Sequence, residues 1–237
     1  MSSIPSLAED GEGLVQAAGI HDAAEAAMLL TAGVDWLGFP LRLTHHREDL
    51  SEAEAARLIR SLPDPARAVL ITYLDRAAEI AELCRFLGAR KVQLHGVIDA
   101  RELASLRRSD PGLFLLKSLV VRPGGERELA ADVARFEPHV DAFLTDTFDP
   151  ATGATGATGK AHDWAVSRRL AEISRRPLIL AGGLHPGNVA QAIAEVRPAG
   201  VDSHTGVEGP DGRKDPGLVR SFVAEARAAF RRLKIKN

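Results

Sequence analysis

The chain has 237 residues, of which 45% are hydrophobic, so it can bury the core of one large domain or two small ones. Its 30 basic and 32 acidic residues give a net charge of −2, which argues against nucleic acid as a partner. The sequence shows no apolar run long enough to cross a membrane, no signal peptide at its start, and a single cysteine, Cys84, which rules out an internal disulfide. We therefore expect a cytoplasmic globular protein.

Short apolar runs alternate with amphipathic segments along the whole chain. The apolar runs are rich in Val, Ile, Leu and Phe, which is typical of strands buried on both faces of a parallel sheet. The predicted strands are Leu14–Gly19, Asp35–Phe39, Ala68–Tyr73, Lys91–Leu94, Leu113–Leu119, Asp141–Thr145, Pro177–Ala181 and Gly200–Ser203.

The amphipathic segments between these runs predict helices. Asp22 is suited to cap the first of them, and Ser51 followed by Glu54 forms a capping box at the start of the second. The predicted helices are Asp22–Thr31, Ser51–Ser61, Asp75–Phe86, Asp99–Arg107, Gly124–Phe136, Asp163–Ser174, Gly187–Val196 and Asp215–Lys234.

This alternation favours a single (β/α)8 barrel, also called a TIM barrel, over residues 1–237. Eight strand–helix units fit the chain length, since such barrels usually have about 250 residues. A doubly wound sheet is the competing fold, but no GxGxxG motif follows the first strand. Residues 1–12 are expected to be a flexible N-terminal extension of the barrel.

In such a barrel the functional residues follow the strands, because the carboxyl ends of all eight strands open at one mouth. Polar residues stand at these positions along the whole chain. Glycines follow the last two strands, at Gly182–Gly183 and in Thr205–Gly206, and glycine lets backbone N–H groups approach an anion closely. We therefore expect Gly182, Gly183, Thr205 and Gly206 to bind a phosphate group.

Several motifs resemble the phosphoribosylanthranilate isomerase family of the tryptophan pathway, over nearly the whole chain. The matching stretches read GVDWLGF (33–39), VQLHG (92–96), TDT (145–147), TGKAHDW (158–164), LAGGLHPGNV (180–189) and TGVEGPDGRKD (205–215). The last two of these stretches are the most specific, because their order and spacing are hard to meet by chance.

The resemblance implies a (β/α)8 barrel that binds a small phosphorylated, ribose-derived substrate and needs no cofactor. It also implies a general acid at Asp146 and an arginine, Arg47, that faces the substrate carboxylate. His95 and Asp202 are expected to contact the substrate as well. The family reaction is an Amadori rearrangement of an aminoaldose to an aminoketose, which needs one acid and one base.

The chain departs from the family at the first strand. The family pattern Lys-Ile-Cys-Gly-Ile-Thr becomes Gln16 to His21, so that Ala18 occupies the position of the cysteine that acts as base. Alanine cannot accept a proton. His21 and His204 are the candidate replacements, because imidazole titrates near neutral pH.

Three alternatives remain open from the sequence. His21, His95 and His204 with Asp146 or Asp202 could hold a catalytic metal, in a diverged reaction on a related sugar phosphate. Lys117 could form a Schiff base. The chain could also bind a phosphorylated metabolite without converting it, because such a protein needs the phosphate site but not the base. The oligomeric state is not determined by the sequence.

Overall fold

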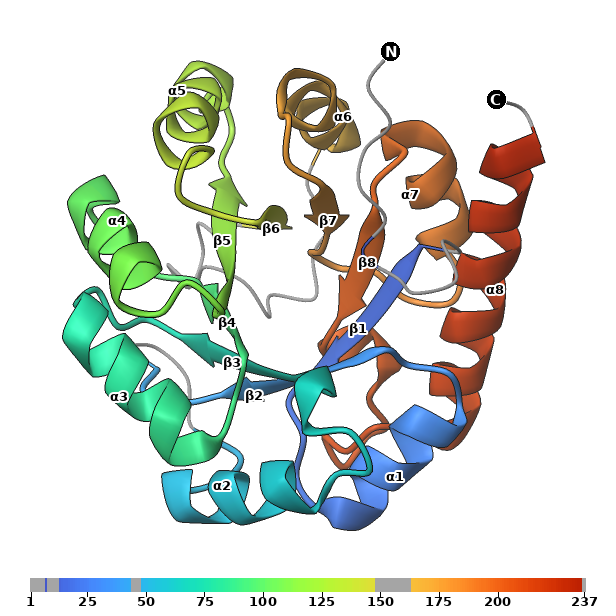
Figure 1. The fold of residues 1–237 in the computed structure, drawn as a ribbon. Helices are drawn as coiled ribbons and strands as arrows, with labels where there is room; N and C mark the ends of the chain where they lie inside the picture. Colours follow the sequence, from blue (N-terminus) through green and yellow to red (C-terminus); the bar gives the residue numbers. More distant parts are fainter. Residues whose placement is uncertain (1–6, 8–12, 44–47, 148–162, 236–237) are drawn as a thin grey trace.

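The computed structural model describes residues 7, 13–43, 48–147 and 163–235. In these ranges, eight parallel strands form a closed barrel in the order β1 to β8, and eight α-helices surround it (Figure 1). The strands are β1 (Leu14–Ala18), β2 (Trp36–Pro40), β3 (Ala68–Thr72), β4 (Lys91–Leu94), β5 (Phe114–Val121), β6 (Ala142–Thr147), β7 (Leu178–Leu180) and β8 (Gly200–Ser203). The predicted TIM barrel is therefore confirmed.

The helices also lie where the sequence predicts them, with ends that differ by up to two residues. They are α1 (Ala23–Thr31), α2 (Glu52–Ser61), α3 (Ala77–Leu87), α4 (Ala100–Ser109), α5 (Glu126–Phe136), α6 (Trp164–Ile173), α7 (Val189–Val196) and α8 (Pro216–Ile235). Asp22 caps α1 by accepting a hydrogen bond from the backbone N–H of Glu25, and the Ser51–Glu54 capping box is formed in full. Among the described residues, no helix is long and apolar enough to span a membrane.

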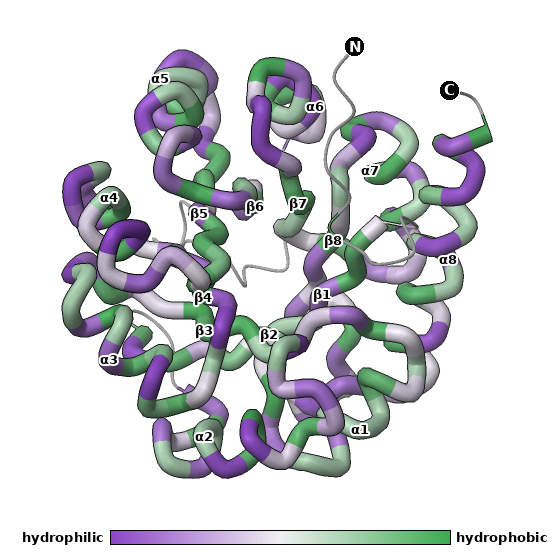
Figure 2. Tube along the Cα trace, viewed as in Figure 1, coloured by the Kyte–Doolittle hydropathy of each residue, from purple (hydrophilic) through white to green (hydrophobic). Residues whose placement is uncertain are grey.

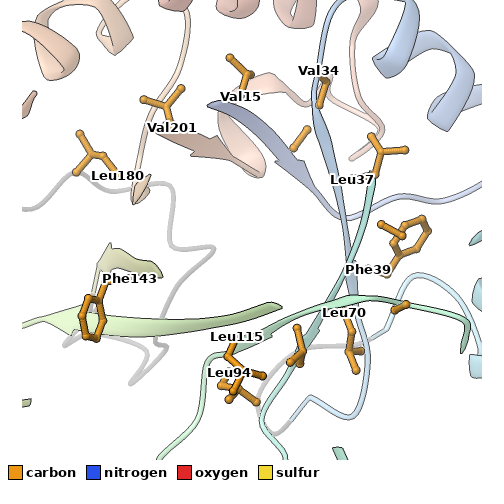
Figure 3. Close-up of a cluster of buried hydrophobic side chains, with 14 of the residues drawn as sticks. Val15, Val34, Leu37, Phe39, Leu70, Leu94, Leu115, Phe143, Leu180 and Val201 are labelled. Carbon is orange, nitrogen blue, oxygen red and sulfur yellow. The ribbon is translucent and has the colours of Figure 1, made fainter. Parts of the chain in front are cut away.

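The apolar residues form two cores, because alternate side chains of a strand point to opposite faces. The larger core lies between the barrel and the helices, as the buried side chains in Figure 3 show for Val15, Leu37 and Phe143. The smaller core fills the barrel itself. Figure 2 shows the strands coloured predominantly hydrophobic and the helices with alternating hydrophobic and hydrophilic residues.

The smaller core decides which strand residues face the barrel interior. Ala18 belongs to it, together with Ile71 of β3 and Ala181 directly after β7. Gln16 is buried two positions before Ala18 on the same strand and so shares its direction. The barrel interior therefore holds buried polar side chains such as Gln16 among apolar ones.

The strand β5 ends at Val121, two residues beyond the predicted end at Leu119. Lys117 lies in the middle of this strand. Most of the expected extension at residues 1–12 lies outside the described residues.

Candidate active site

A hydrogen bond between Gln16 and Gln93 crosses the inside of the barrel. Nε2 of Gln16 on β1 donates to Oε1 of Gln93 on β4 at 2.9 Å, and both side chains are buried. Gln16 is also paired in register with Asp202 on β8. Sequence reasoning missed Gln93, although it lies two residues before His95 on one strand, the spacing that brings two side chains to the same face.

Asp146 lies at the end of β6 and is buried. Its Oδ1 accepts a hydrogen bond from the backbone N–H of Thr147 at 2.7 Å. Burial disfavours the charged carboxylate and raises the pKa of Asp146 to about 7, although the hydrogen bond from Thr147 acts in the opposite direction. A carboxyl group with this pKa can carry a proton at neutral pH and release it.

Asp202 is a second buried carboxyl group, near the end of β8. Burial and, to a smaller extent, the nearby Asp146 raise the pKa of Asp202 to about 7, while a hydrogen bond from Gln16 and the charge of Lys214 lower it. Its Oδ1 is buried and has no hydrogen-bond partner among the described residues. The two carboxyl groups therefore interact electrostatically inside one barrel.

The glycine-bearing loops after β7 and β8 come together as the sequence predicts. Gly182 and Gly183 have positive φ angles of 95° and 63°, which few other residues adopt. Gly206 packs so closely on the carbonyl group of Leu184 that a Cβ atom there would overlap it. Ser203 Oγ donates a hydrogen bond to the same carbonyl oxygen at 2.8 Å.

These loops and both carboxyl groups line one small cavity of about 20 Å³. That volume holds about one water-sized group. The lining residues are Asp146, Ala181, Gly182, Gly183, Leu184, Asp202, Ser203, His204, Thr205 and Gly206.

His204 follows β8 directly and lines the same cavity. Its ring packs against Gly19, where a Cβ atom would collide with Nε2. Nε2 also lies 3.4 Å from Oε1 of Glu208. That Glu208 oxygen accepts a hydrogen bond from Nζ of the buried Lys214 at 2.6 Å, so Glu208 and Lys214 hold the ring in place.

His21 lies at the mouth, but both of its ring nitrogens face carboxylates outside the barrel interior. Nδ1 lies 3.1 Å from Oε2 of Glu25 on α1, and Nε2 lies 3.5 Å from Oδ1 of Asp49. His21 does not line the cavity that contains Asp146.

Arg47 and most of the 158–164 motif lie outside the described residues.

His95 stands at the end of β4 with its Nδ1 atom 3.0 Å from Oγ of Ser118. It also lines a second cavity, of about 490 Å³, that extends from the mouth toward Lys117 and α5. In the described part of the chain, no three His, Cys, Asp or Glu side chains are arranged to hold a metal ion. The metal hypothesis therefore has no geometric support in this region.

Lys117 is engaged in structural contacts. Its Nζ donates hydrogen bonds to the carbonyl oxygens of Leu94, Gly96 and Ser118 at 2.8 to 3.1 Å. Burial lowers the pKa of Lys117 to about 8. These hydrogen bonds tie β5 to the end of β4. Because all three ammonium protons have acceptors, the geometry does not favour Lys117 as the nucleophile of a Schiff base.

The fold and the site together define a (β/α)8 barrel with paired acidic groups beneath two glycine-bearing loops. The family model for N-(5'-phosphoribosyl)anthranilate isomerase matches residues 15–225, and the chain belongs to this family.

Curated relatives agree with this assignment. The isomerase 2 of Methanosarcina mazei is 36% identical over 94% of this chain and 97% of its own, and the enzyme of Citrifermentans bemidjiense is 38% identical over 90% and 96%. Among solved structures, the isomerase of Thermotoga maritima has a TM-score of 0.77 at 26% identity, covering 91% of this chain and 99% of its own.

A phosphoribosyl anthranilate isomerase in complex with reduced 1-(o-carboxyphenylamino)-1-deoxyribulose 5-phosphate is also similar. Its TM-score is 0.75 at 25% identity, over 91% of this chain and 99% of that one.

Proposed function

We propose that this protein isomerises N-(5'-phosphoribosyl)anthranilate to the corresponding 1-deoxyribulose 5-phosphate, a step of tryptophan biosynthesis. The observation that carries the proposal is the position of Asp146. It lies buried in the same cavity as the two glycine-bearing loops, in a chain whose family acts on this substrate.

The loops after β7 and β8 are suited to the substrate phosphate. The backbone N–H groups of Gly183, Thr205 and Gly206 would bind the phosphate, and the close approach at Gly206 leaves no room for a side chain there. Phosphate sites of this fold are frequently built from the same two loops. The bound phosphate would hold the ribose over Asp146.

Asp146 is proposed to deliver a proton to the ring oxygen of the ribose. Its raised pKa of about 7 keeps a large share of the group protonated at neutral pH. His95, near Asp146, and Asp202 would contact the sugar, and Arg47 would contact the carboxylate of the anthranilate.

Because Ala18 offers only a methyl group, the base must come from another residue. Of the two histidines expected from the sequence, His204 is better placed, since it lines the cavity and His21 does not.

The test is direct. Purified protein is mixed with phosphoribosylanthranilate, and loss of the substrate and appearance of the aminoketose are followed, with and without a chelator. We expect turnover that is insensitive to the chelator. Binding without turnover would instead support a silent binding protein, the second candidate, which the loss of the cysteine favours. Turnover abolished by the chelator would support the metal-assisted alternative.

A further inference from the structure

The missing cysteine leaves the reaction without its base on the β1 side of the barrel. Ala18 points into the interior, where its Cβ atom is close enough to β2 that a Cβ added to Gly38 would lie 3.1 Å from it. The strand on the other side of β1 is β8, and its inward-facing side chain near the mouth is Asp202.

We propose that Asp202 is the general base of this enzyme and removes the proton from C2 of the ribose. This inference rests on the isomerase function proposed above and assigns the role that the substitution at Ala18 leaves open. Asp146 and Asp202 then divide the chemistry between two carboxyl groups, one on β6 and one on β8.

The geometry of Asp202 fits a base. Residues 16 and 202 are direct partners in the β1–β8 register, so Asp202 stands beside the strand that carries Ala18. Its Oδ1 is buried without a hydrogen-bond partner in the part of the chain that the structure describes, and its lone pairs are available for a proton. The residue lines the same cavity as Asp146, Gly183 and Thr205, which places it next to the proposed phosphate site.

The electrostatics fit as well. Asp202 faces Gln16 on β1, Asp146 on β6 and Lys214 in the loop before α8, and each of them shifts its pKa. Two buried carboxyl groups that repel each other tend to share one negative charge, so that one is protonated while the other is ionised. That state contains one acid and one base, which is what the rearrangement requires.

The proposed step balances. Asp146 protonates the ring oxygen as the bond between C1 and that oxygen breaks, and the nitrogen lone pair forms a C=N⁺ bond to C1. The Asp202 carboxylate then takes the C2 proton, and the freed electron pair forms the C1=C2 bond and neutralises the nitrogen. The resulting enolamine becomes the ketone when Asp202 returns its proton to C1 and the C2 hydroxyl gives its proton to Asp146.

The contacts of the two histidines make them weaker candidates. Both ring nitrogens of His21 face the carboxylates of Glu25 and Asp49. His204 lies beyond the end of β8, with Nε2 packed against Gly19 and 3.4 Å from Oε1 of Glu208. Its position next to Thr205 suits a contact with the phosphate group.

The experiment compares Asp202→Asn with His204→Asn in the steady-state conversion of phosphoribosylanthranilate. Asn keeps the shape of Asp202 but cannot accept the proton, so we expect kcat to fall by roughly 10²- to 10⁴-fold and the ascending limb of the pH–rate profile to disappear. His204→Asn should raise KM, because His204 is placed to contact the phosphate group, and should keep the ascending limb of the pH–rate profile. Asp64→Asn, at the start of the short helix before β3 and remote from the mouth, is the matched control for an Asp-to-Asn change.

Temperature separates the two candidate bases further. The ionisation enthalpy of a carboxyl group is close to zero, whereas that of imidazole is clearly positive, so the limb of the wild-type enzyme should stay at the same pH between 15 and about 40 °C. Melting curves of each variant establish that it is folded.

The outcomes are distinct. A wild-type protein without isomerase activity overturns the proposed function and this inference with it. An active wild type whose ascending limb survives in Asp202→Asn, or moves with temperature and disappears in His204→Asn, overturns only the role of Asp202.

Discussion

Nε2 of His95, directly after β4, lies 4.0 Å from Oδ2 of Asp146 on β6, with both side chains almost completely buried. At this separation the imidazole is a neighbour of the carboxyl group rather than a close hydrogen-bond partner. Among the described residues, the hydrogen bond that stabilises ionised Asp146 comes from the backbone N–H of Thr147, and desolvation outweighs it, so the carboxyl group keeps its proton to about neutral pH. This relationship supports the role of Asp146 as acid.

Replacing Asp146 with Asn should therefore lower kcat by roughly 10²- to 10⁴-fold, the usual contribution of a positioned acid. Phosphate affinity should remain close to that of the wild type, because the glycine-bearing loops are untouched. Steady-state kinetics and calorimetry with inorganic phosphate measure the two quantities. Undiminished turnover by the variant would remove Asp146 from the mechanism.

The buried carboxyl groups should also make stability depend on pH. Burial raises the pKa of Asp146 and Asp202 from the ordinary aspartate value of 3.8 to about 7. The stability that the protonated groups contribute is complete below pH 4 and is lost as the pH rises through 7, because the folded state then has to hold buried charge.

Asp202→Asn should consequently be more stable than the wild type at pH 8, by on the order of a few kcal/mol, and the gain should shrink toward pH 4. Denaturant unfolding at pH 5 and pH 8 gives the free energies of unfolding. An identical pH dependence in variant and wild type would show that Asp202 is ionised throughout.

The close packing at Gly206 predicts the effect of adding a methyl group. Gly206→Ala would push against the Leu184 carbonyl and separate the two loops, at a cost of about 1–3 kcal/mol in stability. Phosphate affinity should fall by roughly tenfold or more, which corresponds to about 1.4 kcal/mol. In contrast, Gly125→Ala at the start of α5 should leave phosphate affinity unchanged. A sulfate or phosphate ion between Gly183 and Gly206 in a crystal of the wild type would identify the site directly.

Restoring the thiol at Ala18 offers a gain-of-function test. In the background of Asp202→Asn, Ala18→Cys places a proton acceptor on the β1 side of the barrel interior and should recover part of the lost turnover. Ala17→Cys puts the same thiol on the opposite face of the strand, within the outer core, and should recover none. Equal rescue by both substitutions would contradict the proposed geometry.

The sequence alone predicted the barrel and the order of its elements. Strand and helix periodicities are local properties, and the caps at Asp22 and Ser51 depend on residues three positions apart. The elements and these caps can therefore be predicted without the tertiary structure. The proposed phosphate site was predicted in the same way, because glycines after β7 and β8 have to meet at one mouth once the barrel closes.

The side-chain partners inside the barrel were decided only by the tertiary structure. Gln16 and Gln93 are 77 residues apart in the chain, and the closure that pairs β1 with β8 brings Gln16 beside Asp202. The pairing of β4 with β5 likewise places Nζ of Lys117 among three carbonyl oxygens. Which polar atoms become desolvated, and hence which carboxyl groups hold a proton at neutral pH, depends on contacts between distant strands that no local pattern contains.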